Sequence, residues 1–184
     1  MSLVTPRLFS QTPYIRRISQ LSASQLSAID RYLQQQLEQN ANNLKKTHYF
    51  HQRFENIYLK TIQNTDLERL LEESLGYCAE LLGMCTDELK IGYWFNLMQP
   101  GHVTTLHRHD DFDELISGVI YLSVPENSGD LVLETPEQSI VIKPVSGNFI
   151  FFDPATPHRV TENRSEHYRL SIGMNIGPAG NTTL

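Results

Sequence analysis

Five polar residues in the second half of the sequence have the types and spacing to build a metal site with an anion site beside it. His107 and His109 are separated by one residue, His158 follows later, and Arg169 stands two residues before Ser171. Neutral imidazole is a ligand that divalent iron accepts readily. The planar guanidinium of arginine binds a carboxylate through two parallel hydrogen bonds. The pattern therefore predicts a transition-metal site next to a carboxylate-binding site.

These side chains must be held by strands, because the sequence after residue 90 consists of short β-rich runs separated by turn residues. The runs cover about 90–97, 103–109, 115–124, 130–134, 139–143, 148–153, 158–162 and 168–176. Alternate residues of a strand share one face, so a strand over 103–109 would point His107 and His109 into the same cavity. Eight short strands with regular turns indicate a jelly roll or a small barrel, and we expect a double-stranded β-helix.

The first half of the sequence has helical periodicity. Apolar residues recur along Ser22–Leu37, with serines at its start that could cap a helix. Thr65-x-x-Glu68 has the form of a capping box, and Gly83 ends the apolar stripe that follows. We expect residues 1–89 to form a mainly helical N-terminal layer on a jelly-roll core at 90–177, and all 184 residues to form a single domain.

The composition narrows the class of protein and its partners. The chain is 40% hydrophobic and 20% charged with a net charge of −6, which indicates a soluble globular protein and disfavours nucleic acid as a partner. There is no apolar run long enough for a membrane span and no signal-peptide pattern. Cys78 and Cys85 would lie about 10 Å apart along a helix, too far for a disulfide, so we expect reduced core residues in a cytoplasmic protein. Sheet edges and helix stripes leave a homodimer open.

Several motifs of the β region together resemble the iron(II)- and 2-oxoglutarate-dependent oxygenases, in particular small bacterial members. The motifs, all between residues 94 and 176, are Trp94-Phe95-Asn96, His107-Arg108-His109, Ser117-Gly118-Val119-Ile120-Tyr121, Gly129-Asp130-Leu131, Gly147-Asn148-Phe149-Ile150-Phe151-Phe152, His158-Arg159-Val160 and Arg169-Leu170-Ser171. The resemblance implies a cupin-like jelly roll that uses Fe(II), O2 and 2-oxoglutarate to hydroxylate a small molecule or peptide, and that releases succinate and CO2. It says little about residues 1–89.

The resemblance also implies a metal-ligand set, with one departure. His107 matches the first ligand and His158 the distal ligand. The family normally has a carboxylate two residues after the first ligand, where this sequence has His109. Either His109 completes a three-histidine site, or Asp111 supplies a carboxylate from a shifted position. We favour His109, because Pro100-Gly101 precedes His107 by the interval usual in the family.

The same resemblance assigns further residues to the co-substrate. Arg169 and Ser171 match the residues that hold the distal carboxylate of 2-oxoglutarate. Tyr121 and Asn96 match positions that can assist them, although Tyr121 would equally serve as a core residue. Three other side chains are expected at the substrate mouth, namely Trp94, Phe112 and Arg159.

Two other functional classes remain as alternatives. A three-histidine cupin-type dioxygenase or isomerase would bind metal without 2-oxoglutarate, and Arg169 would then have no assigned role. A non-enzymatic jelly-roll binding module would bind neither. Dinucleotide, phosphate-loop and nucleophile-elbow motifs are missing from the sequence.

Overall fold

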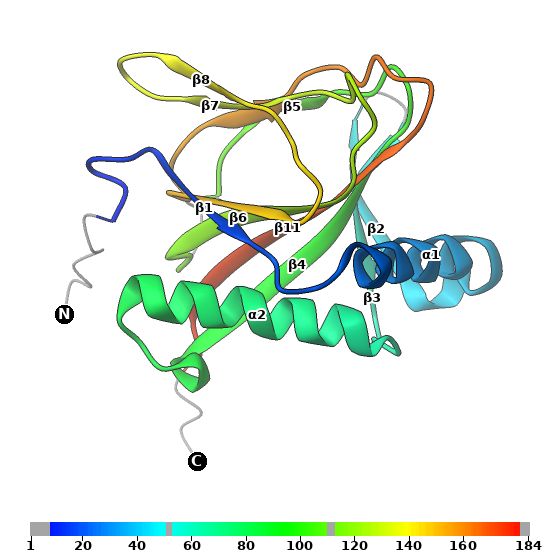
Figure 1. The fold of residues 1–184 in the computed structure, drawn as a ribbon, viewed down its shortest axis with the longest axis horizontal. Coiled ribbons are helices and arrows are strands. Elements are labelled where there is room, and N and C mark those ends of the chain that lie inside the picture. Colours follow the sequence, from blue (N-terminus) through cyan, green and yellow to red (C-terminus); the bar gives the residue numbers. More distant parts are fainter. Residues whose placement is uncertain (1–7, 51–52, 110–112, 181–184) are drawn as a thin grey trace.

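Two antiparallel β-sheets face each other, and two α-helices cover the outer side of the larger sheet (Figure 1). The computed structural model describes residues 8–50, 53–109 and 113–180. The larger sheet has the strand order β1-β9-β6-β11-β4-β3-β2, and the smaller sheet has the order β5-β10-β7-β8.

The eight strands expected after residue 90 are all present. They are β4 (Leu89–Met98), β5 (Thr104–His107), β6 (Ile116–Ser123), β7 (Leu131–Glu134), β8 (Ser139–Ile142), β9 (Asn148–Phe152), β10 (His158–Val160) and β11 (Arg169–Pro178). They divide between the two sheets, β4, β6, β9 and β11 in the larger and the rest in the smaller. The prediction of a jelly-roll core with N-terminal helices is confirmed.

Alternation along the strands of the larger sheet separates two cores. In β11, Leu170, Ile172 and Ile176 pack into the core that includes the helices. The residues between them, such as Arg169 and Ser171, face the smaller sheet and line a cavity there. A second apolar cluster, formed by Tyr121, Leu131, Leu133, Ile142, Ile150 and Phe152, fills part of the space between the sheets. Because polar residues line the inner face of a buried strand, we expect the functional site to lie in this cavity.

The two helices begin and end at residues that satisfy their backbone groups. Helix α1 (Ala23–Gln39) starts with a capping box between Ser22 and Gln25. Helix α2 (Thr65–Leu82) is capped by Asn64, whose side chain accepts a hydrogen bond from the Leu67 N–H, so the capping box predicted at Thr65 does not form. Gly83 ends α2 with a φ of 65°, a left-handed conformation that glycine adopts without strain.

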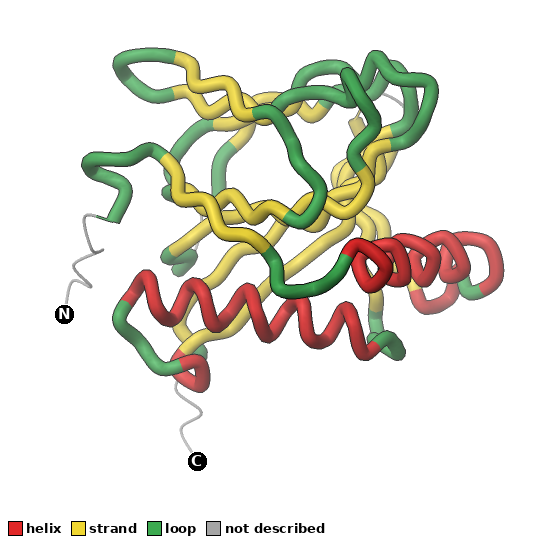
Figure 2. Tube along the Cα trace, viewed as in Figure 1, coloured by secondary structure: helices red, strands yellow, loops and turns green. Residues whose placement is uncertain are grey.

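Three strands in the N-terminal half were not predicted. They are β1 (Tyr14–Ile18), β2 (Leu44–Phe50) and β3 (Arg53–Leu59). They extend the larger sheet at both edges (Figure 2), with β1 paired to β9 and the β2–β3 pair joined to β4. Edge strands are exposed on more than one side, so β2 lacks the alternation of apolar and polar residues that reveals a strand.

Short 3-10 turns precede two of the strands, at Ala41–Asn43 and Thr86–Glu88. Within the described ranges, none of the helices has the length and apolar character needed to cross a bilayer. Cys78 and Cys85 are both unpaired, as expected. Cys78 is buried in α2, but Cys85 is exposed beyond the end of that helix and is not the core residue that the sequence indicated.

Candidate metal centre and co-substrate pocket

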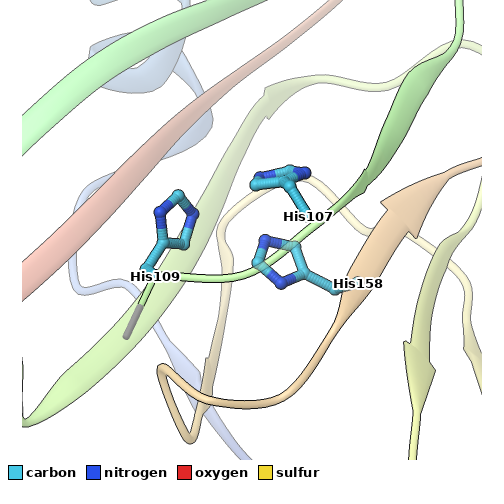
Figure 3. Close-up of side chains that lie close together, drawn as sticks. All are labelled: His107, His109 and His158. Carbon is cyan, nitrogen blue, oxygen red and sulfur yellow. The ribbon is translucent and has the colours of Figure 1, made fainter. Parts of the chain in front are cut away.

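Three histidine rings converge at one end of the cavity between the sheets (Figure 3). His107, His109 and His158 each offer a ring nitrogen, and these atoms lie within 4.8 Å of one another. A bond of about 2.1 Å from each nitrogen to a metal would place neighbouring nitrogens about 3 Å apart.

The backbone brings the three histidines together from two strands and a loop. His158 of β10 lies directly opposite His107 of β5 in the smaller sheet. His109 lies beyond the end of β5, not on the strand as predicted. Its N–H donates to the carbonyl of Pro154 at 2.9 Å, which anchors the segment after β5 to the turn before β10. Strand alternation therefore does not explain the shared direction of His107 and His109; this anchor does.

Hydrogen bonds indicate which ring nitrogens are free to bind a metal. Nδ1 of His107 lies 2.7 Å from the carbonyl of Thr105, and Nδ1 of His158 lies 3.0 Å from the carbonyl of Thr156. A carbonyl only accepts, so each Nδ1 must carry the proton, and each Nε2 keeps its lone pair.

Burial keeps the imidazoles of His109 and His158 in the neutral form that metals bind. Burial and the neighbouring charges of His107 and His109 together lower the pKa of His158 to about 3, although the hydrogen bond to the Thr156 carbonyl opposes the shift. Burial, His107 and His48 lower the pKa of His109 to about 4. Neutral imidazoles at pH 7 are a donor set that fits divalent iron.

At the cavity floor, polar residues form a row across three neighbouring strands. Ser171 of β11 lies opposite Asn96 of β4 on one side and opposite Tyr121 of β6 on the other. Arg169 is two residues before Ser171 and shares its face. The cavity is lined by all four of these residues and by the three histidines. The four residues assigned to the co-substrate are thus together, in the same cavity as the candidate ligands.

Arg169 is buried and forms no ion pair with a described residue. Its exposed fraction is 1%, and no carboxylate in the described parts of the chain forms an ion pair with it. Burial lowers the pKa of its guanidinium, while Tyr121 and the charge of Asp130 oppose that shift. Among the described residues, Nε of Arg169 and the Tyr121 hydroxyl have no hydrogen-bond partner. The guanidinium lies 5.1 Å from the centroid of the Tyr121 ring, and its Nη1 donates to the sulfur of Met98 at 3.5 Å. A buried guanidinium in this state is costly unless an anion joins it. The pocket therefore fits a carboxylate.

The residues expected at the substrate mouth differ in where the structure places them. Trp94 lines the cavity, and its ring centroid lies 5.4 Å from that of His109. Arg159 alternates with His158 along β10, so it points away from the cavity and pairs with Glu134 at 3.3 Å. Its predicted place at the substrate mouth is therefore corrected. Asp111 and Phe112 lie outside the described residues.

Two residues close to the site were not singled out from the sequence. Gly173 lies beneath Trp94, where a Cβ would come within 2.6 Å of the indole. Arg53 of β3 donates to Asn96 at 3.5 Å and to Thr104 at 3.1 Å from outside the cavity lining. The sequence carried no signal for Arg53, because its strand was not recognised.

Comparison with known families decides between the classes that this geometry allows. Residues 93–177 match the model of the 2OG-Fe(II) oxygenase superfamily. This region belongs to that superfamily. The protein is therefore an oxygenase dependent on Fe(II) and 2-oxoglutarate, and the predicted enzyme class and cofactors are confirmed.

Solved structures resemble the oxygenase over most of its length. A prolyl-4-hydroxylase from Pseudomonas putida has a TM-score of 0.69 at 18% identity, covering 94% of this chain and 100% of its own. The carbocyclase SnoK from nogalamycin biosynthesis has a TM-score of 0.72 at 15% identity, covering 96% and 84%. The epimerase SnoN, solved with Fe3+, α-ketoglutarate and nogalamycin RO, has a TM-score of 0.71 at 13% identity, covering 94% and 83%. At such identities the likeness shows the fold. No curated protein matches the chain.

Proposed function

We propose that His107, His109 and His158 hold Fe(II) in this oxygenase as a three-histidine site. The convergence of the three rings, the two carbonyl contacts that free Nε2 atoms, and the burial of His158 support this assignment. Asp111→Ala tests the alternative ligand: iron binding should stay nearly intact, whereas His107→Ala should abolish it. A loss in Asp111→Ala as large as that in His107→Ala would reject His109 as the second ligand.

Arg169 and Ser171, assisted by Tyr121 and Asn96, would hold the far carboxylate of 2-oxoglutarate. The single observation that carries this proposal is the buried Arg169, which forms no ion pair with a described residue and lines the cavity that also contains the histidines. A three-histidine enzyme that does not use 2-oxoglutarate, or a non-enzymatic module, would leave this guanidinium without its counter-charge.

The reaction we propose is hydroxylation of an unactivated C–H bond in a small molecule or peptide. Bound Fe(II) and 2-oxoglutarate supply the oxidising chemistry: O2 provides one oxygen atom to the substrate and one to succinate, and the co-substrate loses CO2. The chain's residues orient the co-substrate by its carboxylate and keep bulk water from the buried pocket. Trp94 beside His109 would form one wall for the substrate, with Phe112 as a further proposed contact.

The remaining assignments concern the whole chain. We propose one domain over residues 1–184, supported by a larger sheet that takes strands from both halves of the sequence. We propose a cytoplasmic location on the basis of two unpaired cysteines. A homodimer through an exposed sheet edge remains a proposal, and nucleic acid is not expected as a partner.

An anaerobic titration of the purified protein with Fe(II) and 2-oxoglutarate tests the proposed site. We expect the visible charge-transfer band of a chelated keto acid, its loss in His158→Ala and its weakening in Arg169→Ala. Iron binding without the band would favour the cupin-type enzyme, and absence of metal binding would reject the three-histidine site.

A further inference from the structure

A buried ion pair lies just outside the cavity lining and has no role in the function proposed above. Arg53 and Glu55, both on β3, are only 6% and 5% exposed. The pair is joined by one contact of 3.4 Å between Nη2 and Oε1. Removing two charges from water for a single contact is unfavourable. The ion pair is therefore not explained by stability alone, and its other contacts reach the functional site.

The first set of contacts runs from Arg53 to the start of β5, the strand that carries His107. Its Nη2 donates to the carbonyl of Val103 at 2.8 Å and to the hydroxyl of Thr104 at 3.1 Å. Its Nη1 donates to Oδ1 of Asn96 at 3.5 Å. Because that amide oxygen is engaged by Arg53, the amide N–H groups of Asn96 are left to donate elsewhere. Arg53 thereby links the larger sheet to the smaller one at the pocket.

The second set of contacts connects Arg53 to Arg169 through a shared wall. The Thr104 hydroxyl donates to the sulfur of Met98 at 4.0 Å, and Nη1 of Arg169 donates to the same sulfur at 3.5 Å. The two guanidinium charges also interact directly: burial is the largest cause of a lowered pKa of Arg53, and the charge of Arg169 lowers it further, while Glu55 raises it. Arg53 therefore acts on Asn96 and Arg169, two of the four residues assigned to the far carboxylate of the co-substrate.

We propose that Arg53 and Glu55 are a positioning pair for 2-oxoglutarate. Arg53 holds the Asn96 amide and the Thr104–Met98 wall in place and adds positive charge behind the pocket, and Glu55 partly cancels that charge. The inference rests on the proposed placement of the co-substrate carboxylate at Arg169. Neither residue lines the cavity, so they act through Asn96, Met98 and the electric field rather than by contact.

Two variants that break the same ion pair should change co-substrate binding in opposite directions. Arg53→Met removes the donors and leaves Glu55 as an unopposed negative charge, so the Kd for 2-oxoglutarate should rise about tenfold or more. Glu55→Gln keeps an oxygen that accepts from Arg53 but leaves the guanidinium charge unopposed, so the Kd should fall about threefold. Both should lower Tm, because both disrupt a buried pair.

The measurement is calorimetric titration of 2-oxoglutarate into the anaerobic Fe(II)-loaded full chain, with Fe(II) affinity measured separately and expected to stay unchanged. Leu33→Ala is the stability control, because Leu33 is buried in the helix-side core. It should lower Tm without changing the Kd. Arg53→Lys keeps the charge and should recover part of the binding lost in Arg53→Met, which also serves if Arg53→Met does not fold.

Opposite changes of Kd in the two variants, with partial rescue by Arg53→Lys, would support the positioning role. Parallel weakening that follows the loss of Tm, or no change of Kd in either variant, would overturn it and leave a structural ion pair. If the unmodified protein itself binds Fe(II) but not 2-oxoglutarate, the proposed function fails first, and the positioning role fails with it.

Discussion

At the scale of single residues, the proposed metal site differs from the family in its charge. Within the described residues, the cluster that could hold a metal consists of histidines alone. A ferrous ion bound by neutral ligands keeps its full double charge, whereas a carboxylate ligand would reduce it by one. The dianionic co-substrate should therefore be attracted more strongly than at a carboxylate-containing site, and the metal should be held less tightly.

His109→Asp tests directly whether the three-histidine site binds 2-oxoglutarate more tightly and Fe(II) less tightly than a site with a carboxylate. The added carboxylate should strengthen Fe(II) binding and weaken 2-oxoglutarate binding about tenfold, because it lowers the charge that the dianion meets. Both constants can be measured anaerobically by calorimetry. His109→Asn, which is neutral, is the matched control for the change in size. A tighter co-substrate complex in His109→Asp would contradict the charge argument.

Arg169→Lys separates the charge of the carboxylate clamp from its shape. Lysine keeps the positive charge but cannot form the two parallel hydrogen bonds of a guanidinium. We expect 2-oxoglutarate binding to weaken about 10- to 100-fold while Fe(II) affinity is retained. Titration of the charge-transfer band gives the first quantity and a metal-binding assay the second. Unchanged co-substrate affinity would show that Arg169 is not the clamp.

At the scale of elements, β4 and β11 pair along ten residues and decide which side chains reach the cavity. In one step of this pairing, Trp94 lies opposite Gly173, and the indole occupies the space that a side chain on Gly173 would need. The indole can therefore lie over the sheet and approach His109. A glycine within a strand is used here for close packing, not for a special backbone angle.

Gly173→Ala should move the indole and disturb the site. The added Cβ would overlap Trp94, so we expect a loss of about 1–3 kcal/mol of unfolding free energy. Trp94 is the only tryptophan in the chain, so its fluorescence should shift as well. In Gly118→Ala, the Cβ would meet Phe151 on the helix side instead. This control should lose stability with little change in Trp94 fluorescence; equal shifts in both variants would refute the local explanation.

The sequence was sufficient for the elements whose residues contact one another in regular patterns. β9 is buried along its whole length and is marked by a continuous apolar run, and helix α1 is marked by the helical spacing of its buried residues. The edge strands β1 and β2 show no regular alternation of buried and exposed residues, and β3, which lies between β2 and β4, is buried only at alternate residues near its start. The candidate ligands were found by type and spacing, but Arg53 and the anchor of His109 at Pro154 depend on long-range contacts that no local pattern encodes.

At the scale of the whole molecule, the chemistry and the stability are located on opposite faces of the larger sheet. The helix-side core includes Leu70 and Leu33, both fully buried, and the cavity faces the smaller sheet. Leu70→Ala should therefore cost about 2–5 kcal/mol of unfolding free energy, because it leaves a cavity in a packed core. Chemical denaturation measures this loss. The Kd for 2-oxoglutarate at a temperature where the variant is folded should not change, and a large change would mean that the two faces are coupled.

The position of β11 has a consequence for how the protein is made. It is the last strand along the described chain, yet it lies in the middle of the larger sheet, between β4 and β6. As the chain emerges from the ribosome, the earlier strands have no central partner until residues 169–178 arrive. Arg169 and Ser171 belong to that strand, so the same stage of synthesis completes the sheet and adds the proposed carboxylate-binding residues to the pocket. A partly synthesised chain would thus hold its iron ligands before it could hold a co-substrate.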